Sequence, residues 1–200
     1  MNGNIDWHEI RRKIFHILGG IVLATAIYYE ILVAWMVLII VGFGIILSVI
    51  YTLYDVPIIN YFLNKFERKH LRKKFPGKGV IYLFLAVLFL MLMFEKNIVI
   101  AGILIWAFGD SLSAIVGKHY PNGTKHPLND ARIIEGTLAG IIVGGIAAAF
   151  FVNWIFAIIG ATISMTIESL DWKIYRETFD DNFFVPIVGS FVIYFLTLVF

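Results

Sequence analysis

The sequence predicts an all-α protein, a polytopic integral membrane helix bundle of about seven transmembrane helices that forms a single domain over residues 1–200. Of its 200 residues, 60% are hydrophobic and only 15% are charged, and the mean hydropathy is +0.86. Soluble domains are about 45–50% apolar and about 25% charged. The apolar residues form long runs separated by short polar stretches, as membrane-spanning helices do. The chain has 0 Cys, which excludes a disulfide scaffold and thiolate metal sites.

Seven apolar runs approach the roughly 20 residues that a spanning helix needs. They cover residues 14–29, 31–53, 79–94, 97–116, 133–151, 154–170 and 183–200. The third run is short and the fifth and sixth carry acids near one end, so we expect tilt or partial burial there. Residues 58–75 place apolar side chains at helical spacing on one face and mainly basic side chains on the other. This pattern predicts a basic amphipathic helix in the membrane interface. The first run also resembles a signal peptide, an interpretation that the later spans disfavour.

The basic residues predict the orientation of the bundle. If the seven runs alternate in direction, 15 of the 16 Lys and Arg residues share a side with the N-terminus, and only Lys96 lies opposite. Because basic residues gather on the cytoplasmic side, the N-terminus is predicted to be cytoplasmic and the C-terminus outside. Only two acids, Glu30 and Glu95, fall on the outer side. We therefore expect a multi-pass protein of a prokaryotic cell membrane with its active site on the cytoplasmic face.

Polar residues within the spans gather toward their cytoplasmic ends, where they indicate function. Glu9, Arg12 and His16 share one helical face. Arg11 and Lys13, by contrast, are explained as anchors whose long side chains reach the interface. Asp110 lies six residues inside its span, about 9 Å deep at 1.5 Å per residue. An unpaired carboxylate is costly there, so Asp110 is expected either to pair with a base or to bind a metal.

Two further clusters carry acids. Glu135 begins a helix in which Gly136, Gly140 and Gly144 form a small-residue face that lets another helix approach closely. Glu168 ends the sixth run, and Asp180-Asp181-Asn182 precedes the last run, where these residues could cap the helix or bind a metal or nucleotide.

Asp110, Glu135, Glu168 and Asp181 thus come from four helices at similar depth, with bases beside them. Convergent carboxylates suit a hard cation such as Mg²⁺ that bridges phosphates. The sequence contains no G-x-x-x-x-G-K-[ST], H-E-x-x-H or G-x-S-x-G motif, which argues against a P-loop kinase, a zinc protease and a serine hydrolase.

Five ordered motifs resemble those of the CTP-dependent lipid kinases, which include dolichol or polyprenol kinase, phytol kinase and the CTP-using diacylglycerol kinase. These enzymes are in turn similar to phosphatidate cytidylyltransferases. The resemblance covers nearly the whole chain. The motifs are Arg12-Lys13-x-x-His16, Pro76-Gly77-Lys78-Gly79, Phe108-Gly109-Asp110-x-x-Ser113-Ala114-x-x-Gly117-Lys118, Glu135-Gly136-Thr137-Leu138-Ala139-Gly140 and Asp180-Asp181-Asn182-x-x-Val185-Pro186.

The resemblance implies transfer of the γ-phosphoryl group of CTP to the hydroxyl of a membrane polyprenol-type or dolichol-type alcohol, giving a lipid phosphate and CDP. It implies that Asp110 and Glu135 are catalytic, orienting the hydroxyl or accepting its proton. The implied ligands of Mg²⁺, or of another divalent cation, are Asp110, Glu168, Asp181 and Asn182. The implied nucleotide contacts are Arg12, Lys13, His16, Lys78, Gly117, Lys118, Lys125 and Arg132.

The expected partners are CTP, a lipid alcohol and the bilayer, without nucleic acid, and a homodimer is left open. A CTP-dependent diacylglycerol kinase or a phosphatidate cytidylyltransferase-like enzyme is the enzymatic alternative. A small transporter is the alternative from another class, because intramembrane acids also mark ion paths. Transporters place their sites near the midplane, whereas polarity here is confined to one face, which favours an enzyme.

Overall fold

The structure is a computed structural model that describes residues 7–54, 57, 60, 61, 63, 75–120, 122–127, 129–170, 173, 174, 177, 178 and 180–200. Over these residues the chain is an all-helical bundle. Its helices are α1 (Trp7–Tyr28), α2 (Ala34–Leu53), α4 (Lys78–Met93), α5 (Lys96–Leu104), the π-helical turn η1 (Ile105–Asp110), α6 (Ser111–His119), α7 (Ile134–Ala148), α8 (Trp154–Ser169) and α9 (Asp181–Val199). The predicted amphipathic helix over 58–75 lies largely outside the described residues.

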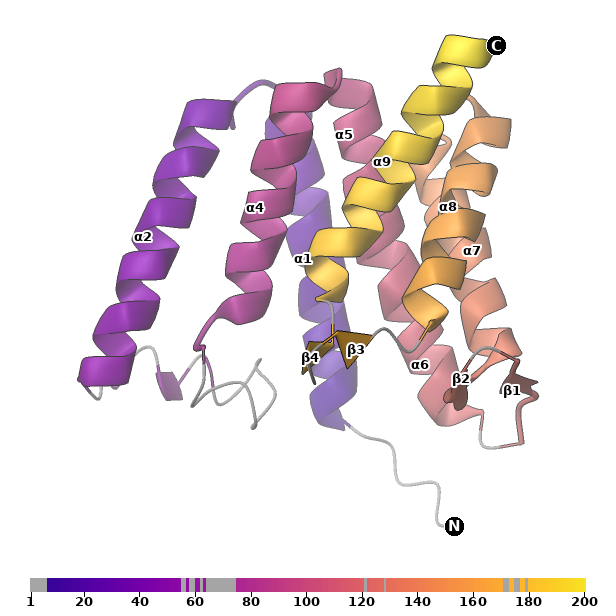
Figure 1. Cartoon of the computed structure of the whole chain (residues 1–200), viewed down its shortest axis with the longest axis horizontal. Helices are drawn as coiled ribbons and strands as arrows, with labels where there is room; N and C mark the ends of the chain where they lie inside the picture. Colours follow the sequence, from indigo (N-terminus) through magenta and orange to yellow (C-terminus); the bar gives the residue numbers. More distant parts are fainter. Residues whose placement is uncertain are drawn as a thin grey trace.

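Helices α5, η1 and α6 form one continuous segment, and apart from these, successive helices run in alternating directions (Figure 1). The two ends of the bundle carry different kinds of connection. Short connections lie at the end that carries the C-terminus. There the Lys96 ammonium donates a hydrogen bond of 2.6 Å to Glu30 Oε1 and holds the pKa of the Glu30 carboxyl below its usual value. The start of α1, the starts of α7 and α9 and the short hairpins lie at the opposite end. All the candidate site residues belong to this second end, as the sequence predicts.

Each predicted span corresponds to a helix of the bundle, with ends that agree within about seven residues. In the described part of the chain, three helical segments are long and apolar enough to cross a membrane: α2, the continuous segment Lys96–His119, and α9. Helices α4, α7 and α8 are apolar but shorter. These lengths are compatible with a membrane protein, and the seven-span arrangement stays a prediction.

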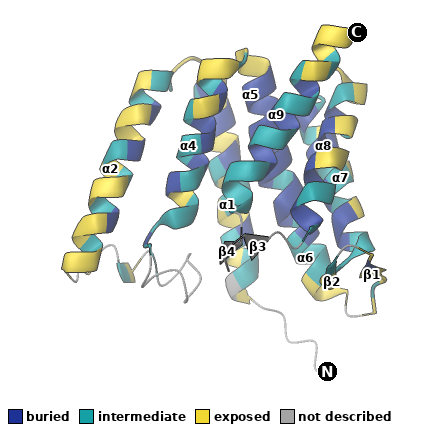
Figure 2. Ribbon diagram, viewed as in Figure 1, coloured by how far each residue is buried: buried dark blue, intermediate teal, exposed yellow. Residues whose placement is uncertain are grey.

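The segment Lys96–His119 is the centre of the bundle, and 78% of its most apolar stretch is buried (Figure 2). Val99, Ile100 and Ile103 on α5 are fully enclosed. Helices α1, α7, α8 and α9 all contact this segment. Helix α2 is peripheral, and most of its apolar side chains are exposed. The bundle therefore has a buried central helix and an apolar outer surface.

Glycines bring α7 into close contact with the central segment. A Cβ atom added at Gly136 would lie 2.8 Å from the carbonyl oxygen of Ser113, and one at Gly140 would lie 2.7 Å from that of Gly109. At Gly144 the added atom would meet the backbone of Gly109 at 3.2 Å. This confirms the small-residue face predicted from the sequence, and its partner is the helix that carries Asp110.

Two short hairpins at the N-terminal end of the bundle are absent from the sequence prediction. Strand β1 (Lys125–His126) pairs with β2 (Asn129–Ile133), and β3 (Lys173–Ile174) pairs with β4 (Glu177–Thr178), both antiparallel. The first hairpin leads directly into α7, and the second stands between α8 and α9. The two hairpins thus precede the first residues of α7 and α9 in the chain.

Candidate functional site

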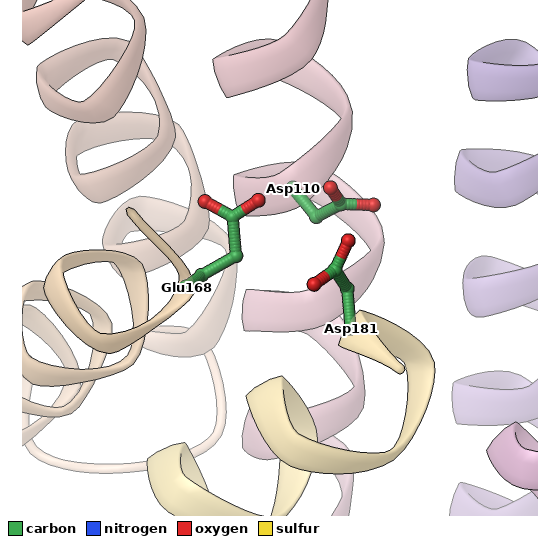
Figure 3. Close-up of side chains that lie close together, drawn as sticks. All are labelled: Asp110, Glu168 and Asp181. Carbon is green, nitrogen blue, oxygen red and sulfur yellow. The ribbon is translucent and has the colours of Figure 1, made fainter. Parts of the chain in front are cut away.

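Three carboxylates converge at the N-terminal end of the bundle (Figure 3). One oxygen of each of Asp110, Glu168 and Asp181 lies within 4.8 Å of those of the other two. Asp110 ends the π-helical turn, Glu168 lies in the last turn of α8, and Asp181 is the first residue of α9. Asp110 and Glu168 are buried, and Asp181 is partly buried. We call these three residues the carboxylate triad.

The π-helical turn Ile105–Asp110 presents Asp110 to the triad. The sequence predicts an uninterrupted α-helix here, but the chain takes a wider turn over six residues before α6 begins at Ser111. A π-turn inserts an extra residue and rotates all following side chains relative to the preceding helix, and such turns are frequent at functional sites. This turn therefore sets the direction of Asp110 relative to the buried face of α5.

Lys13 forms an ion pair with Asp110. Its Nζ donates a hydrogen bond of 2.6 Å to Asp110 Oδ2, and its side chain is 2% exposed. The sequence-based explanation of Lys13 as an interfacial anchor is therefore wrong, although it fits Arg11, which is exposed. It follows that Lys13 contacts a triad carboxylate directly.

Glu168 is the least satisfied member of the triad. Arg132, at the end of the first hairpin, forms an ion pair with Glu168 Oε1. Within the described chain, however, neither carboxylate oxygen of Glu168 has a well-aligned hydrogen-bond donor, and the side chain is 1% exposed. Buried polar atoms normally have partners, so Glu168 Oε2, which no described residue contacts as a donor, leaves an acceptor open for a ligand.

His16 and Trp106 border the triad. His16 Nε2 lies 3.6 Å from Asp110 Oδ2, and the His16 ring lies 4.2 Å from the Trp106 ring. Trp106 Nε1 donates a hydrogen bond of 3.0 Å to Asn182 Oδ1. Asn182 therefore positions Trp106, and its predicted role as a metal ligand stays a prediction.

The start of α9 combines a cap with the site. Asp180 Oδ1 accepts hydrogen bonds from the backbone N–H of Asn182 at 3.1 Å and from its side-chain amide at 2.6 Å. Asp180 therefore caps the helix, as one of the two sequence interpretations expects. A Cβ atom added at Gly79 would lie 2.8 Å from Asn182 Nδ2, so the start of α4 also packs against this corner.

A second cluster joins bases of α1 and α6 through one acid. Glu9 Oε1 lies 2.5 Å from Arg12 Nη2, and Glu9 Oε2 lies 3.3 Å from Lys118 Nζ. Arg12 Nε is buried, and no described residue accepts a hydrogen bond from it. We call Glu9, Arg12 and Lys118 the basic cluster. This cluster is linked to the triad through the chain, because Arg12 is followed by Lys13, which pairs with Asp110.

The other predicted site residues are distributed around this centre. Gly117 lies where α6 passes Gly136 of α7. Lys78 begins α4, with its Nζ 5.2 Å from the centre of the Tyr82 ring. Lys125 is exposed on β1. These three residues lie on α6, α4 and β1, and none of them is a member of the carboxylate triad.

Glu135 does not belong to the triad. Both of its carboxylate oxygens accept hydrogen bonds of 3.0 Å from the backbone N–H of Thr124. The acid therefore closes the loop that leads from α6 to the first hairpin. This corrects the expectation that four carboxylates converge, because the loop takes Glu135 as its own hydrogen-bond acceptor.

The residues of the triad fit a divalent cation. All their donor atoms are carboxylate oxygens, the ligand type that Mg²⁺ prefers. The three carboxylates have only two bases beside them, Lys13 and Arg132, so a cation is favoured when all three are ionised. Glu168 Oε2, which has no donor among the described residues, would gain a partner at the same time. The donor set and the unsatisfied atom therefore agree.

Comparison with known proteins gives one informative relative. The protein named "Uncharacterized protein MJ1137", from Methanocaldococcus jannaschii, is 31% identical over 189 residues, which cover 92% of this chain and 92% of the relative. No protein-family model matches the chain, and no solved structure matches it significantly. An alignment of this extent includes most of the helical bundle. The chain therefore belongs to the same family as the Methanocaldococcus jannaschii protein.

Proposed function

We propose that the chain is a CTP-dependent lipid kinase that spans the membrane seven times and phosphorylates a polyprenol-type alcohol at the cytoplasmic face. The observation that carries the proposal is the triad of buried carboxylates beside Lys13 and Arg132, at the end of the bundle where the basic residues gather. The ordered motifs that resemble CTP-dependent lipid kinases support the same reaction. Asp110 and Asp181 belong to two of those motifs, and Glu168 lies outside them.

The outer surface of the bundle supports a membrane location for all its helices. Large apolar side chains on α2, such as Leu38, Ile39 and Phe43, are about 60% exposed. Soluble proteins rarely expose apolar patches larger than a few hundred Å², because each Å² costs about 25 cal/mol in water. The shorter helices α4, α7 and α8 are then accommodated by local thinning of the bilayer.

The basic residues of the site can bind an anionic phosphoryl donor. Arg12 and Lys118 present positive charge from two helices at the cytoplasmic end, and Lys78 at the start of α4 and Lys125 on β1 add charge at the same end. Phosphoryl transfer depends mainly on positioning and on neutralising the phosphate charge. The basic cluster would therefore hold the triphosphate while the triad faces the transferred group.

Asp110, Glu168 and Asp181 would hold the divalent cation, which supplies charge neutralisation at the phosphates when it is bound. In the reaction, the lipid oxygen forms a bond to the γ-phosphorus and the bond from that phosphorus to the β,γ-bridging oxygen breaks. CDP leaves, and the proton of the lipid hydroxyl passes to a triad carboxylate. Lys13 holds Asp110 in place during these events through its 2.6 Å hydrogen bond.

The proposal is tested by incubating the purified protein with CTP labelled at either the α- or the γ-phosphate and with polyprenol, phytol, diacylglycerol or phosphatidate. A kinase transfers the γ-label to lipid and releases CDP. A cytidylyltransferase instead transfers the α-label and releases pyrophosphate, and it requires a lipid phosphate. Absence of both transfers, with a cation-dependent flux in vesicles, would favour a transporter and contradict the proposal.

A further inference from the structure

Trp106 is a buried ring beside the carboxylate triad that the sequence does not single out. It lies in the π-helical turn four residues before Asp110, and it is 2% exposed. Residues four apart lie one above the other on nearly the same side of a helical turn. His16 contacts both of them, because its Nε2 lies 3.6 Å from Asp110 Oδ2 and its ring lies 4.2 Å from the Trp106 ring. Trp106 therefore borders the triad from the turn that carries Asp110.

Helix α1 holds the Trp106 ring in place. A Cβ atom added at Gly20 would lie 2.2 Å from Ala107 Cβ and 3.6 Å from Trp106 Cζ3. His16, one turn earlier in α1, lies against the same ring. A ring enclosed in this way has little freedom to turn, because protein interiors are packed as densely as organic crystals. The packing of α1 on the π-helical turn therefore fixes the direction of the indole N–H.

Asn182 connects this indole to the cap of α9. Trp106 Nε1 donates a hydrogen bond of 3.0 Å to Asn182 Oδ1, and Asn182 Nδ2 donates one of 2.6 Å to Asp180 Oδ1. An indole N–H can only donate and an ionised carboxylate can only accept, so the side chain between them must do both. An amide does both, whereas a carboxylate would lack the donor. We call Trp106, Asn182 and Asp180 the amide bridge.

The amide bridge holds the two chain neighbours of Asp181. Asp180 precedes this triad residue and Asn182 follows it, and the backbone N–H of Asn182 also donates a hydrogen bond of 3.1 Å to Asp180 Oδ1. The start of α4 closes the bridge from another side, since a Cβ atom added at Gly79 would lie 2.8 Å from Asn182 Nδ2. The bridge thus ties the first turn of α9, which carries Asp181, to the π-helical turn, which carries Asp110.

We propose that Trp106 is a positioning residue that, through the amide bridge, fixes Asp181 relative to Asp110 and so makes the triad favour Mg²⁺ over Ca²⁺. The inference rests on the cation site of the proposed function. Mg²⁺ requires a near-ideal octahedron of ligands at about 2.0–2.1 Å, whereas Ca²⁺ accepts flexible arrangements at about 2.3–2.6 Å. A rigid set of ligands therefore favours Mg²⁺. Groups that orient metal ligands typically contribute about 10–100-fold to metal affinity.

Two substitutions break the amide bridge without changing a triad residue. Trp106→Phe removes the indole donor and keeps an aromatic ring. Gly79→Ala displaces the amide of Asn182 from the side of α4, and alanine forms helices better than glycine, so α4 itself is not weakened. Trp154→Phe makes the first exchange at a 67% exposed position of α8, and Ile100→Val perturbs the buried core of α5. These two proteins are the controls.

Cation binding is measured on each full-length protein in phosphatidylcholine nanodiscs, without CTP or lipid alcohol. The probe is Mn²⁺, whose free concentration is followed by electron paramagnetic resonance while Mg²⁺ or Ca²⁺ displaces it. Wild type and both controls should bind Mg²⁺ more tightly than Ca²⁺. In Trp106→Phe and Gly79→Ala, Kd for Mg²⁺ should rise about tenfold or more, and Kd for Ca²⁺ should rise less, so the preference for Mg²⁺ falls.

Two results would overturn the positioning role. The first is the same preference for Mg²⁺ in all five proteins, and if Trp106→Phe does not fold, Gly79→Ala decides this point. The second is tighter Mg²⁺ binding by Trp106→Phe, because the oxygen of Asn182 released by this substitution would then act as a ligand.

The binding assay needs no turnover, which separates this inference from the proposed function. If the bridge variants lose the preference for Mg²⁺ and no protein transfers phosphoryl groups, the proposed function fails and the positioning role stands. If wild type transfers the γ-phosphoryl group of CTP and the bridge variants keep the preference, the positioning role fails and the proposed function stands. Absence of Mn²⁺ binding to wild type would contradict both.

Discussion

Replacing Glu168 by glutamine should lower the stability of the protein slightly in the absence of divalent cations and abolish its stabilisation by them. The carboxylate of Glu168 is buried within 4.8 Å of two others, and its oxygens have no aligned hydrogen-bond donor among the described residues. Glutamine keeps the shape of the side chain and removes the charge. The two carboxylates that remain would be balanced by Lys13 and Arg132.

The magnitude follows from the charges. Two unit charges 4.8 Å apart interact by about 3 kcal/mol at an effective dielectric constant of 20. Glu168 is repelled by two carboxylates at up to 4.8 Å and attracted by the guanidinium of Arg132 in direct contact, so the repulsions and the attraction nearly cancel. A glutamine that finds only part of its hydrogen bonds costs about 1–2 kcal/mol. We therefore expect Glu168→Gln to be about 1–2 kcal/mol less stable than wild type in EDTA, or about 2–8 °C lower in Tm.

The assay is thermal unfolding of the purified protein in EDTA and across a series of Mg²⁺ or Mn²⁺ concentrations. Wild type should gain about 2.7 kcal/mol at a cation concentration one hundred times Kd, and Glu168→Gln should gain almost nothing. Asp130→Asn, which removes an exposed acid of β2, is the matched control and should behave as wild type. A Glu168→Gln protein that gains as much stability from cations as wild type does would refute the reasoning.

Three further predictions concern other parts of the bundle. Glu9→Gln should lower Kd for CTP in a calorimetric titration, because it removes the anion that occupies Arg12; weaker binding would show that Glu9 orients the base instead. Gly140→Val should lower the free energy of unfolding by about 3 kcal/mol or more, since its side chain has no room against α5–η1–α6, and an unchanged Tm would contradict the helix contact. Single cysteines at Lys125 and Glu95, in a chain with no other cysteine, should be labelled from opposite sides of a sealed vesicle, and labelling from one side would contradict the seven-span topology.

Periodicity and hydropathy predict most of the fold because long apolar runs have few alternatives to helices. The ranges expected for the spans match the helices closely, and the spacing of Gly136, Gly140 and Gly144 predicts a helix contact that the structure confirms. The sequence could not reveal the π-helical turn before Asp110, since an extra residue in one turn leaves no mark on apolar composition. Residue composition also gave no signal for the short hairpins, whose strands are two to five residues long.

The carboxylates of the site could be predicted because charged residues within apolar runs are few, and three of the four expected acids do converge. Their partners were harder to predict. Lys13 has the sequence context of an interfacial anchor, and only the crossing of α1 over η1 shows that it reaches Asp110. Glu135 has the context of a site residue, yet a loop conformation without a sequence signature turns it toward Thr124. Pairing between distant helices depends on their relative rotation, which local sequence does not encode.

The most direct test of the central claim is transfer of the γ-phosphoryl group of CTP to a polyprenol by wild type, Asp110→Asn and the control Asp130→Asn, with Tm measured on the same preparations. Asp110→Asn leaves Lys13 facing an amide and should reduce turnover by at least about a hundredfold, in a protein that remains folded and monodisperse. Wild type and Asp130→Asn should give labelled polyprenyl phosphate at equal rates, dependent on divalent cation. Near-wild-type turnover by a folded Asp110→Asn protein would contradict the claim that the carboxylate triad is the catalytic centre.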